Sequence, residues 1–436
     1  MKKIYTFLTV FITSLCINAQ TLYFPPTTGN IWDTISPPSL NWCQNQIDSL
    51  YAYLDTNNTK AFILLKEGKI VLEKYFGTHT QVSPWQWASA GKTITSFMVG
   101  IAQQENYLSI ADTTSKYLNP AWTDCTIEQE EKISIRHQLA MTSGLDDGVA
   151  DHYCTLDTCL IYKADAGTRW AYHNGPYTLL DNVIENATGI SLNAYITQKL
   201  KNPTGMTGAF VSLGYNNVFF SNARSMARFG LLILNNGNWN GTQIMTDTAY
   251  FNQMVNTSQS LNQAYGYLWW LNGKSTFMIP GSQIVFNGSL SPNAPSDMLV
   301  AMGKDGQFLN IVPSQDLVWV RMGNSPDELP VPFLMNDKIW EYINSLDCNT
   351  IGLNEQTHAP NLVQIFPNPS NGKLNIKSDK QILKIEIYTI HGQCVKTENT
   401  QNKNLIISIN ELSSGFYLLK VDFNVGSSWI GKLICE

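Results

Sequence analysis

The order of apolar patterns along the chain predicts an α/β (α+β) fold: an antiparallel sheet flanked by helices, joined to a mainly helical lobe and followed by a small all-β sandwich. Three observations carry this prediction. A helix and a strand hairpin open the chain, and a long stretch of helical periodicity follows. Strand patterns then return before a last helix. Strands from both ends can therefore pair in one sheet.

The first elements lie between residues 39 and 104. Residues 39–54 carry apolar side chains at helical spacing, and residues 60–77 form two apolar runs around a Glu67-Gly68 turn, which is typical of a hairpin. A further helix begins near Ser89. Between residues 83 and 103 its only charged side chain is Lys92, so this helix is expected to be buried.

The remaining elements complete the predicted sheet. Residues 105–250 show helical periodicity broken by turns, with no convincing long strand. Strand patterns are expected at residues 265–271, 298–302, 308–312 and 317–320, and a helix at 334–346. The helical stretch then forms a second lobe, and Ser89 lies in a cleft where the two lobes meet.

The segments outside this domain differ from it in residue composition and pattern. Residues 1–19 join two lysines to an apolar run too short to span a bilayer, which is typical of a cleaved signal peptide. Residues 20–348 form the main domain, 349–361 a polar linker, and 362–436 short alternating strands of a β-sandwich. We expect a secreted or cell-surface protein without a transmembrane segment.

Composition limits the partners. The net charge is −6 and no basic cluster occurs, so nucleic acid is not expected. The six histidines are scattered and no Cys-x-x-Cys occurs, so neither a metal nor another cofactor is expected. Of eight cysteines, Cys16 leaves with the signal, and an odd seven remain in an exported chain. Cys154 and Cys159 could close a small loop, and Cys43 and Cys348 could join the two ends of the domain.

The chemistry centres on Ser89 and Lys92. Three residues apart, they share one face of a helix. A lone ammonium on a buried helix is costly unless it is paired or deprotonated, and a hydroxyl beside such a lysine is a nucleophile beside its base. The spacing alone is weak, because Ser370 and Lys373 repeat it in a turn-rich stretch.

Further motifs in a fixed order strengthen the assignment. They are Trp-Ala-Ser-Ala-Gly-Lys at 87–92, His-Gln-Leu-Ala-Met-Thr-Ser-Gly-Leu at 137–145, Trp-Ala-Tyr-His-Asn-Gly-Pro-Tyr-Thr-Leu-Leu at 170–180, Met-Ala-Arg-Phe-Gly-Leu at 226–231, Tyr-Gly-Tyr-Leu-Trp-Trp at 265–270 and Gly-Lys-Asp-Gly-Gln at 303–307. Together they resemble the serine β-lactamase-related hydrolases, which include class C β-lactamases, D-alanyl peptidases, esterases and amide hydrolases. The resemblance covers residues 40–346 and implies the β-lactamase/transpeptidase-like fold.

The resemblance implies a role for four residues near the helix. Ser89 would be the acylated nucleophile and Lys92 would accept its proton. Tyr172 would be the partner general base, and Asn174 would orient Lys92 and the substrate amide. Tyr-x-Asn also occurs at residues 215–217 and 342–344, so the tripeptide alone proves nothing.

The Lys-x-Gly motif at residues 304–306 would line the cleft. Lys304 would bind substrate and supply positive charge, and Gly306 would allow close approach of the backbone. The N–H groups of Ser89 and Gln307 would form the oxyanion hole. Asp305 departs from the small residue usual in the family, which leaves the substrate open among a β-lactam, a D-amino-acid peptide and a carboxylic ester.

Two alternatives stay open. The chain could be a catalytically inactive penicillin-binding-like protein that binds peptidoglycan or peptide. The tryptophans at positions 87, 170, 269 and 270 could line an acyl pocket or only fill the core, and His173 is expected in a supporting or surface position rather than as a base. No Gly-x-Ser-x-Gly elbow occurs, which argues against an α/β-hydrolase.

The C-terminal strands resemble a second family. The motifs are Phe-Pro-Asn-Pro at 366–369, His-Gly-Gln at 391–393, Leu-Ser-Ser-Gly-Phe-Tyr at 412–417 and Lys-Leu-Ile at 432–434. They look like the type A sorting domain of the type IX secretion system, which implies that machinery as a partner. A carbohydrate-binding sandwich is the rival, but it would require exposed aromatics along a strand, and Trp429 is the only tryptophan here.

Overall fold

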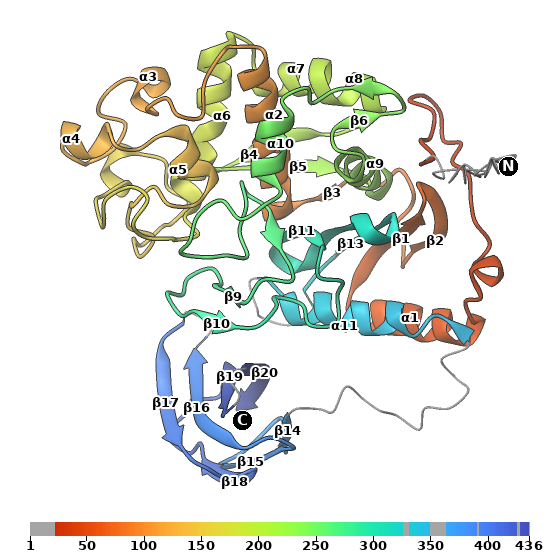
Figure 1. Ribbon diagram of the computed structural model, residues 1–436, viewed down its shortest axis with the longest axis vertical. Helices are drawn as coiled ribbons and strands as arrows, with labels where there is room; N and C mark the ends of the chain where they lie inside the picture. The colour runs from red at the N-terminus through yellow and green to blue at the C-terminus, as the bar shows by residue number, and fades with distance from the viewer. Residues whose placement is uncertain (1–21, 326–330, 349–362, 390–391, 425–427, 436) are drawn as a thin grey trace, which may run out of the picture.

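A computed structural model describes residues 22–325, 331–348, 363–389, 392–424 and 428–435 (Figure 1). Its centre is a six-stranded antiparallel sheet in the order β2-β1-β13-β12-β11-β8. The strands are β1 (Thr59–Lys66), β2 (Lys69–Tyr75), β8 (Trp270–Leu271), β11 (Leu299–Gly303), β12 (Gln307–Val312) and β13 (Leu317–Gly323). As predicted, strands from both ends of the domain pair, since β1 lies beside β13.

Helices cover both faces of this sheet. Helices α1 (Gln44–Thr56) and α11 (Phe333–Asn344) lie side by side on one face, and α9 (Ala223–Leu234) packs on the other (Figure 1). Strands β12 and β13 are buried along their whole length, because side chains on both faces meet helices. This explains why their sequences are almost continuously apolar.

The second lobe is mainly helical, as predicted. Its long helices are α2 (Lys92–Gln104) and α6 (Asn174–Thr188), which pack against each other. The shorter helices are α3 (Ser115–Leu118), α4 (Ile127–Glu130), α5 (Ile135–Leu139), α7 (Leu192–Ile196), α8 (Asn202–Thr204) and α10 (Thr248–Met254). No described helix is both long and apolar enough to cross a membrane.

One hairpin in this lobe was not expected. Strands β4 (Ala209–Leu213) and β5 (Asn216–Ser221) pair, and β3 (Trp85–Gln86) joins them at β5. The sequence conceals β4 because Val211 and Leu213 face solvent, at 44% and 51% exposure, so no buried apolar stripe forms. This small sheet holds the turn that carries Ser89.

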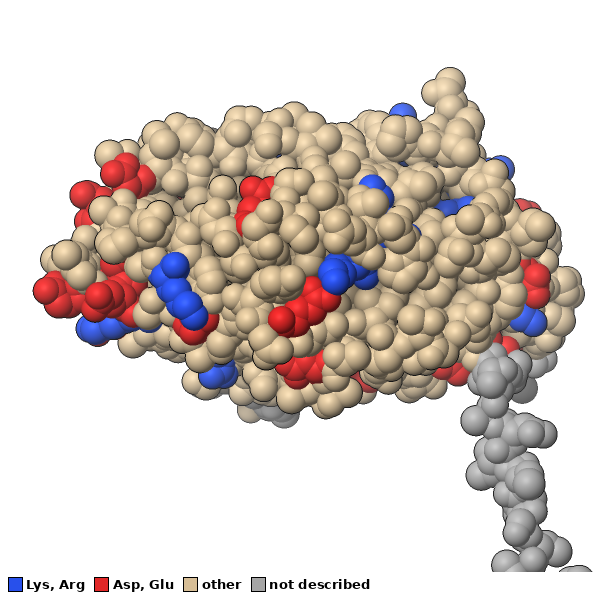
Figure 2. Space-filling model, turned by 90° about the horizontal axis from the view of Figure 1, so that it is seen from above, with Lys and Arg blue, Asp and Glu red and all other residues tan. Residues whose placement is uncertain are grey.

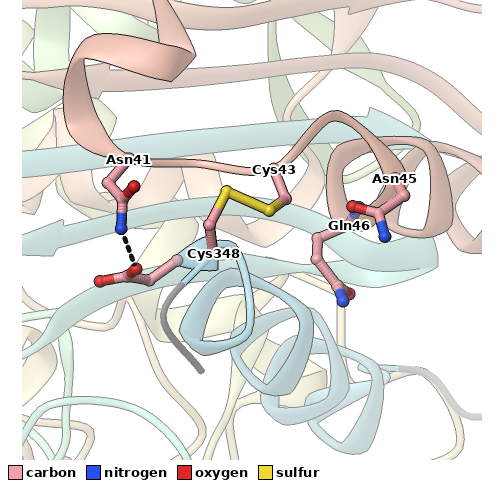
Figure 3. Close-up of a disulfide and its surroundings, with 6 residues drawn as sticks. Asn41, Cys43, Asn45, Gln46 and Cys348 are labelled. Atoms are coloured by element: carbon pink, nitrogen blue, oxygen red, sulfur yellow. Dashed lines mark hydrogen bonds between the residues drawn. A yellow bond between two sulfur atoms is a disulfide. The ribbon is translucent and has the colours of Figure 1, made fainter. Parts of the chain in front are cut away.

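Both hypothesised disulfides are present. Cys43 and Cys348, 305 residues apart, are joined at the start of α1 and just after α11 (Figure 3). Beside this bond, the Asn41 side chain donates to the Asp347 carboxylate at 2.6 Å. Cys154 and Cys159 close a small loop. Among the described residues, Cys125, Cys394 and Cys435 are free.

The C-terminal part is all-β, as predicted. Two sheets, β14-β15-β18 and β17-β16-β19-β20, enclose a separate apolar core. Their strands are β14 (Val363–Phe366), β15 (Lys373–Ser378), β16 (Ile382–Thr389), β17 (Cys394–Asn399), β18 (Asn404–Ser408), β19 (Gly415–Phe423) and β20 (Ser428–Cys435). This part touches the segment of β9 (Thr276–Phe277) and β10 (Phe286–Asn287), where Phe286 meets Tyr388 edge to face. The predicted signal peptide and linker lie outside the described residues.

Candidate active site

The turn that carries Ser89 is a 3-10 segment, η2 (Ala88–Gly91), which leads directly into α2. Ala88 has a φ of 46°, which is uncommon for a residue with a Cβ and must be imposed by the surroundings. Trp87 supplies that restraint, because its backbone N–H donates to Phe219 O at 2.8 Å and its indole N–H to Ser221 Oγ at 2.8 Å. Strand β5 therefore fixes the position of Ser89.

Lys92 is buried beside the Ser89 hydroxyl, with only 3% exposure. Its Nζ lies 3.0 Å from Ser89 Oγ and 2.8 Å from Asn174 Oδ1. The same atom lies 4.1 Å from the centre of the Tyr177 ring. No carboxylate within the described part of the chain forms an ion pair with Lys92. Burial therefore dominates and lowers the pKa of Lys92 to about 7.

Tyr172 borders the same site. The Lys92 Nζ that contacts Ser89 Oγ lies 5.2 Å from the Tyr172 ring centre. The Tyr172 ring stacks on Trp270 and meets Tyr265 edge to face, at centroid distances of 5.9 and 6.2 Å. Burial raises the pKa of Tyr172 well above its usual value, although the nearby Ser89 side chain opposes this.

Four predicted residues thus meet at one point: Ser89, Lys92, Tyr172 and Asn174. The repeated motifs do not join them. Tyr215 is 40% exposed at the β4–β5 turn, and the other Tyr-x-Asn starts on α11. Ser370 lies in the C-terminal part, where its hydroxyl donates to Lys373 O. The tryptophans at 87, 170, 269 and 270 are all buried at 4% exposure or less and pack in the main core.

The Lys-x-Gly motif at residues 304–306 differs from expectation in which glycine lies beside Ser89. Strand β11 packs against η2, and its last residue, Gly303, makes the close approach. A Cβ at Gly303 would clash with the Trp87 carbonyl oxygen and come within 3.0 Å of the Ala90 nitrogen. A Cβ at Gly306 would instead clash with the Arg321 guanidinium, away from Ser89. The glycine that the site requires is Gly303.

Lys304 and Gln307 also differ from expectation. The Lys304 side chain is exposed, and it forms no hydrogen bond or ion pair with another described residue. Gln307 is fully buried on β12, which lies between β11 and β13, and its amide donates to Gly323 O at 2.6 Å. Because neighbouring strands occupy both sides of β12, the Gln307 backbone faces them rather than a substrate.

Sequence reasoning missed Asp181 and left His173 open between a supporting and a surface position. Asp181 is buried on α6, seven residues after Asn174 and therefore on the same helix face. That spacing was the only available signal. His173 is not at the surface: it is 1% exposed, burial lowers its pKa to about 4, and neither ring nitrogen has a hydrogen-bond partner within the described structure.

The arrangement suits nucleophilic chemistry. The Ser89 hydroxyl contacts a lysine whose pKa allows a neutral amine near pH 7, and a tyrosine that stays protonated lies beside that lysine. In the part of the chain that the structure describes, no three His, Cys, Asp or Glu side chains gather as metal ligands would. On the face in Figure 2, charged side chains are sparse and both signs are interspersed.

Two family profiles match this sequence. One, described as Beta-lactamase, matches residues 58–343; the other, described as Secretion system C-terminal sorting domain, matches residues 364–436. Among curated proteins, Protein flp of Staphylococcus aureus (strain COL) is 29% identical over 190 residues. That alignment covers 38% of each chain, so this sequence spans well under half of its relative.

Solved structures give the fold. A protein from Bacillus anthracis provisionally named a 6-aminohexanoate-dimer hydrolase matches with a TM-score of 0.55 at 20% identity, over 74% of this chain and 89% of that one. A provisionally named beta-lactamase from Bacteroides dorei matches with a TM-score of 0.55 at 16% identity, over 70% and 99%. The octameric penicillin-binding protein homologue from Pyrococcus abyssi reaches 0.53 at 13% identity, over 89% and 96%. At such identities the likeness concerns the fold alone.

Proposed function

Since the chain belongs to the Beta-lactamase family and carries a secretion system C-terminal sorting domain, we propose that it is a secreted serine hydrolase that cleaves an ester or an amide through a Ser89 acyl-enzyme. The observation that supports this most directly is the 3.0 Å approach of Lys92 Nζ to Ser89 Oγ at the start of a buried helix whose only charged side chain is Lys92. The sorting domain implies type IX secretion machinery as a partner. Cleavage of residues 1–19 as a signal peptide is part of the same proposal.

Acylation begins with a proton transfer. Ser89 Oγ attacks the substrate carbonyl carbon while its proton passes to neutral Lys92, and the new C–Oγ bond gives a tetrahedral oxyanion. Asn174 holds the Lys92 amine in place through its side-chain oxygen. The C–O or C–N bond to the leaving group then breaks, and the leaving group takes a proton.

Tyr172 is assigned as the proton relay to that leaving group. A phenolate would need nearby cations, but burial keeps the Tyr172 hydroxyl protonated. Its hydroxyl can therefore donate to the leaving group while the proton held by Lys92 replaces the one it gives. Water attacks the acyl-enzyme in the second half-reaction, loses a proton to the same pair, and restores the Ser89 hydroxyl as the acid leaves.

The oxyanion hole is assigned to Ser89 N–H and to the free edge of β11. Met298 O accepts from Asn272 N on the β8 side, and alternate residues of a strand face the same neighbour. Met302 therefore faces that side beyond the end of β8. Gly303 is extended, with φ −127° and ψ 162°, so the Lys304 N–H follows the same direction. Lys304 thus contributes its backbone rather than its ammonium, and it replaces Gln307 as the second donor.

Covalent labelling of the full chain tests the proposal. A fluorophosphonate is expected to attach to the peptide that contains Ser89, as read by mass spectrometry, and Ser89→Ala to abolish the adduct and lower ester hydrolysis by about 10⁴-fold. Ser370→Ala is the matched control, because it removes the serine of the repeated motif. Folded wild-type protein that forms no adduct would instead support the inactive penicillin-binding-like alternative.

Substitutions at Lys304 and Gly303 distinguish a role of the Lys304 side chain from a role of the backbone at the end of β11. We expect Lys304→Ala to change turnover of carboxylate-bearing and neutral substrates equally, within about threefold, because the ammonium is exposed. Gly303→Ala should cost far more, because its Cβ would displace the Ser89 turn. Turnover is measured on p-nitrophenyl esters, a cephalosporin and D-alanyl peptides, which also narrows the substrate class. A selective loss of carboxylate substrates in Lys304→Ala would restore the ammonium as a binding group.

A further inference from the structure

Asp181 is a buried carboxylate with no cation within ion-pair distance in the described structure. It lies on α6 at 6% exposure. Its Oδ1 accepts from Thr95 Oγ1 at 3.1 Å and its Oδ2 accepts from Asn217 Nδ2 at 2.8 Å. Two neutral donors compensate only part of the cost of burying a carboxylate. A group that is so costly and lies on the interface of α2 and α6 calls for a functional explanation.

The packing of the two helices connects Asp181 to Lys92. Thr95 follows Lys92 by one turn of α2, and Asp181 follows Asn174 by two turns of α6, so the pairs lie along one interface. Tyr177, also on α6, lies beside Lys92, with the centre of its ring 4.1 Å from Lys92 Nζ, and the Asp181 charge acts on its hydroxyl as well. Both groups are buried, Asp181 at 6% and Lys92 at 3% exposure, so the interaction between their charges is stronger than at a surface.

We propose that Asp181 is a positioning residue of the serine hydrolase proposed above, and that its carboxylate keeps Lys92 basic enough to take the proton from Ser89. The proposal rests on that function and adds a residue that never touches the substrate. Burial alone would make the Lys92 amine a progressively weaker base. A general base works best when its pKa lies near the working pH.

The directions in which the pKa values of Lys92 and Asp181 are shifted agree with this role. The Asp181 charge raises the pKa of Lys92 and opposes the larger effect of burial, and burial raises the pKa of Asp181 itself to about 7. The two groups therefore titrate as a pair. The other titratable groups that face the pair are Glu185, Tyr177 and Tyr172 from α6 and its approach, Tyr215 from the β4–β5 turn, and His152 from the loop before α6.

A polar cavity gives Asp181 its own access to solvent. The cavity has a volume of about 220 Å³ and lies between α6 and the β4–β5 hairpin. Carboxylate, amide and hydroxyl side chains line most of it, including Asp181, Glu185, Asn182, Asn217 and Thr178. Asp181 can therefore exchange its proton with water on this side while a substrate covers Ser89.

The pH dependence of Ser89 labelling tests the role of Asp181. The rate at which a fluorophosphonate labels the full chain is measured as a function of pH, and its fall at low pH is called the acid limb. In Asp181→Asn the acid limb should move to lower pH by about half to one unit, and the highest rate, the plateau at high pH, should be lower. The sign follows because loss of the carboxylate lowers the pKa of Lys92 and weakens it as a base. Thr95→Val, which removes a donor to the carboxylate, should move the limb the same way by less.

Glu185→Gln is the matched control. Glu185 lines the same cavity one turn further along α6, and its charge raises the pKa of Asp181, so its loss should move the acid limb slightly to higher pH, opposite to Asp181→Asn. An unchanged midpoint in both Asp181→Asn and Thr95→Val, whatever the plateau, overturns the inference while the labelling itself still supports the hydrolase. If Asp181→Asn does not fold, Thr95→Val alone decides. Absence of labelling in wild type would sink the proposed function instead.

Discussion

Lys92→Met is expected to lower acylation of Ser89 by about 10³-fold, because a general base supplies two to four orders of magnitude. Methionine keeps the length and apolar surroundings of the side chain but cannot accept a proton. Stopped-flow or quench measurement of ester turnover gives the rate. Lys338→Met is the control, since that lysine is exposed and paired with Glu341 on α11. Acylation at the wild-type rate would show that Lys92 is not the base.

The same residue predicts how wild-type activity depends on pH. Because the pKa of Lys92 is lowered to about 7, the amine is mostly neutral above that pH and mostly protonated below it. Acylation should therefore fall about tenfold for each pH unit below the limb, so that pH 5 gives about one hundredth of the plateau rate. Activity that stays constant down to pH 5 would contradict a lysine base.

Arg321→Met is expected to destabilise the protein by about 3–5 kcal/mol, because each buried acceptor left without a donor costs about 1–3 kcal/mol. Arg321 is fully buried on β13. Its guanidinium donates to the carbonyls of Asp305, Gly306, Asn57 and Asn324, at 2.6, 2.8, 2.7 and 2.8 Å, and to the Thr59 hydroxyl at 3.1 Å. Methionine would leave these acceptors without a donor.

Denaturant unfolding measures this loss, with Arg136→Met as control because that arginine is exposed. A second consequence concerns activity. Asp305 and Gly306 form the turn that follows β11, so Arg321 fixes the strand end beside Ser89. Activity should fall more than the folded fraction does. A variant with wild-type stability would mean that water satisfies the four carbonyls.

The proximity of Ser89 and Lys92 could be predicted because a Ser-x-x-Lys with the single charge on an otherwise apolar helix is visible without a structure, and their side chains lie 3.0 Å apart. The sheet order followed from apolar runs near both ends of the domain. The glycine that lies beside Ser89 could not be predicted from the Lys-x-Gly motif, because residue types do not show where the strand before it ends. Only the contact of Gly303 with Trp87 identifies the strand residue beside the site.

Asp181 illustrates a different limit. No motif marks it, because its importance depends on the packing of α2 against α6 and on the Thr95 hydroxyl that this packing brings to it. Likewise, His173 was expected in a supporting or surface position, and burial depends on tertiary contacts that a neighbour in sequence does not reveal. A local sequence pattern identifies Ser89 and Lys92, whereas residues that shift the pKa of Lys92, such as Asp181, are brought to it only by long-range packing.

The disulfide between Cys43 and Cys348 has a mechanical consequence. Along the backbone, a pull on the C-terminal part of the chain reaches the main domain at Cys348, just after α11. Without the bond, tension would peel α11 from the sheet one turn at a time. With it, the load passes covalently to the start of α1, so both helices are stressed together and resist as a unit. A chain carried by its C-terminal sorting domain would in this way keep its main domain folded under tension.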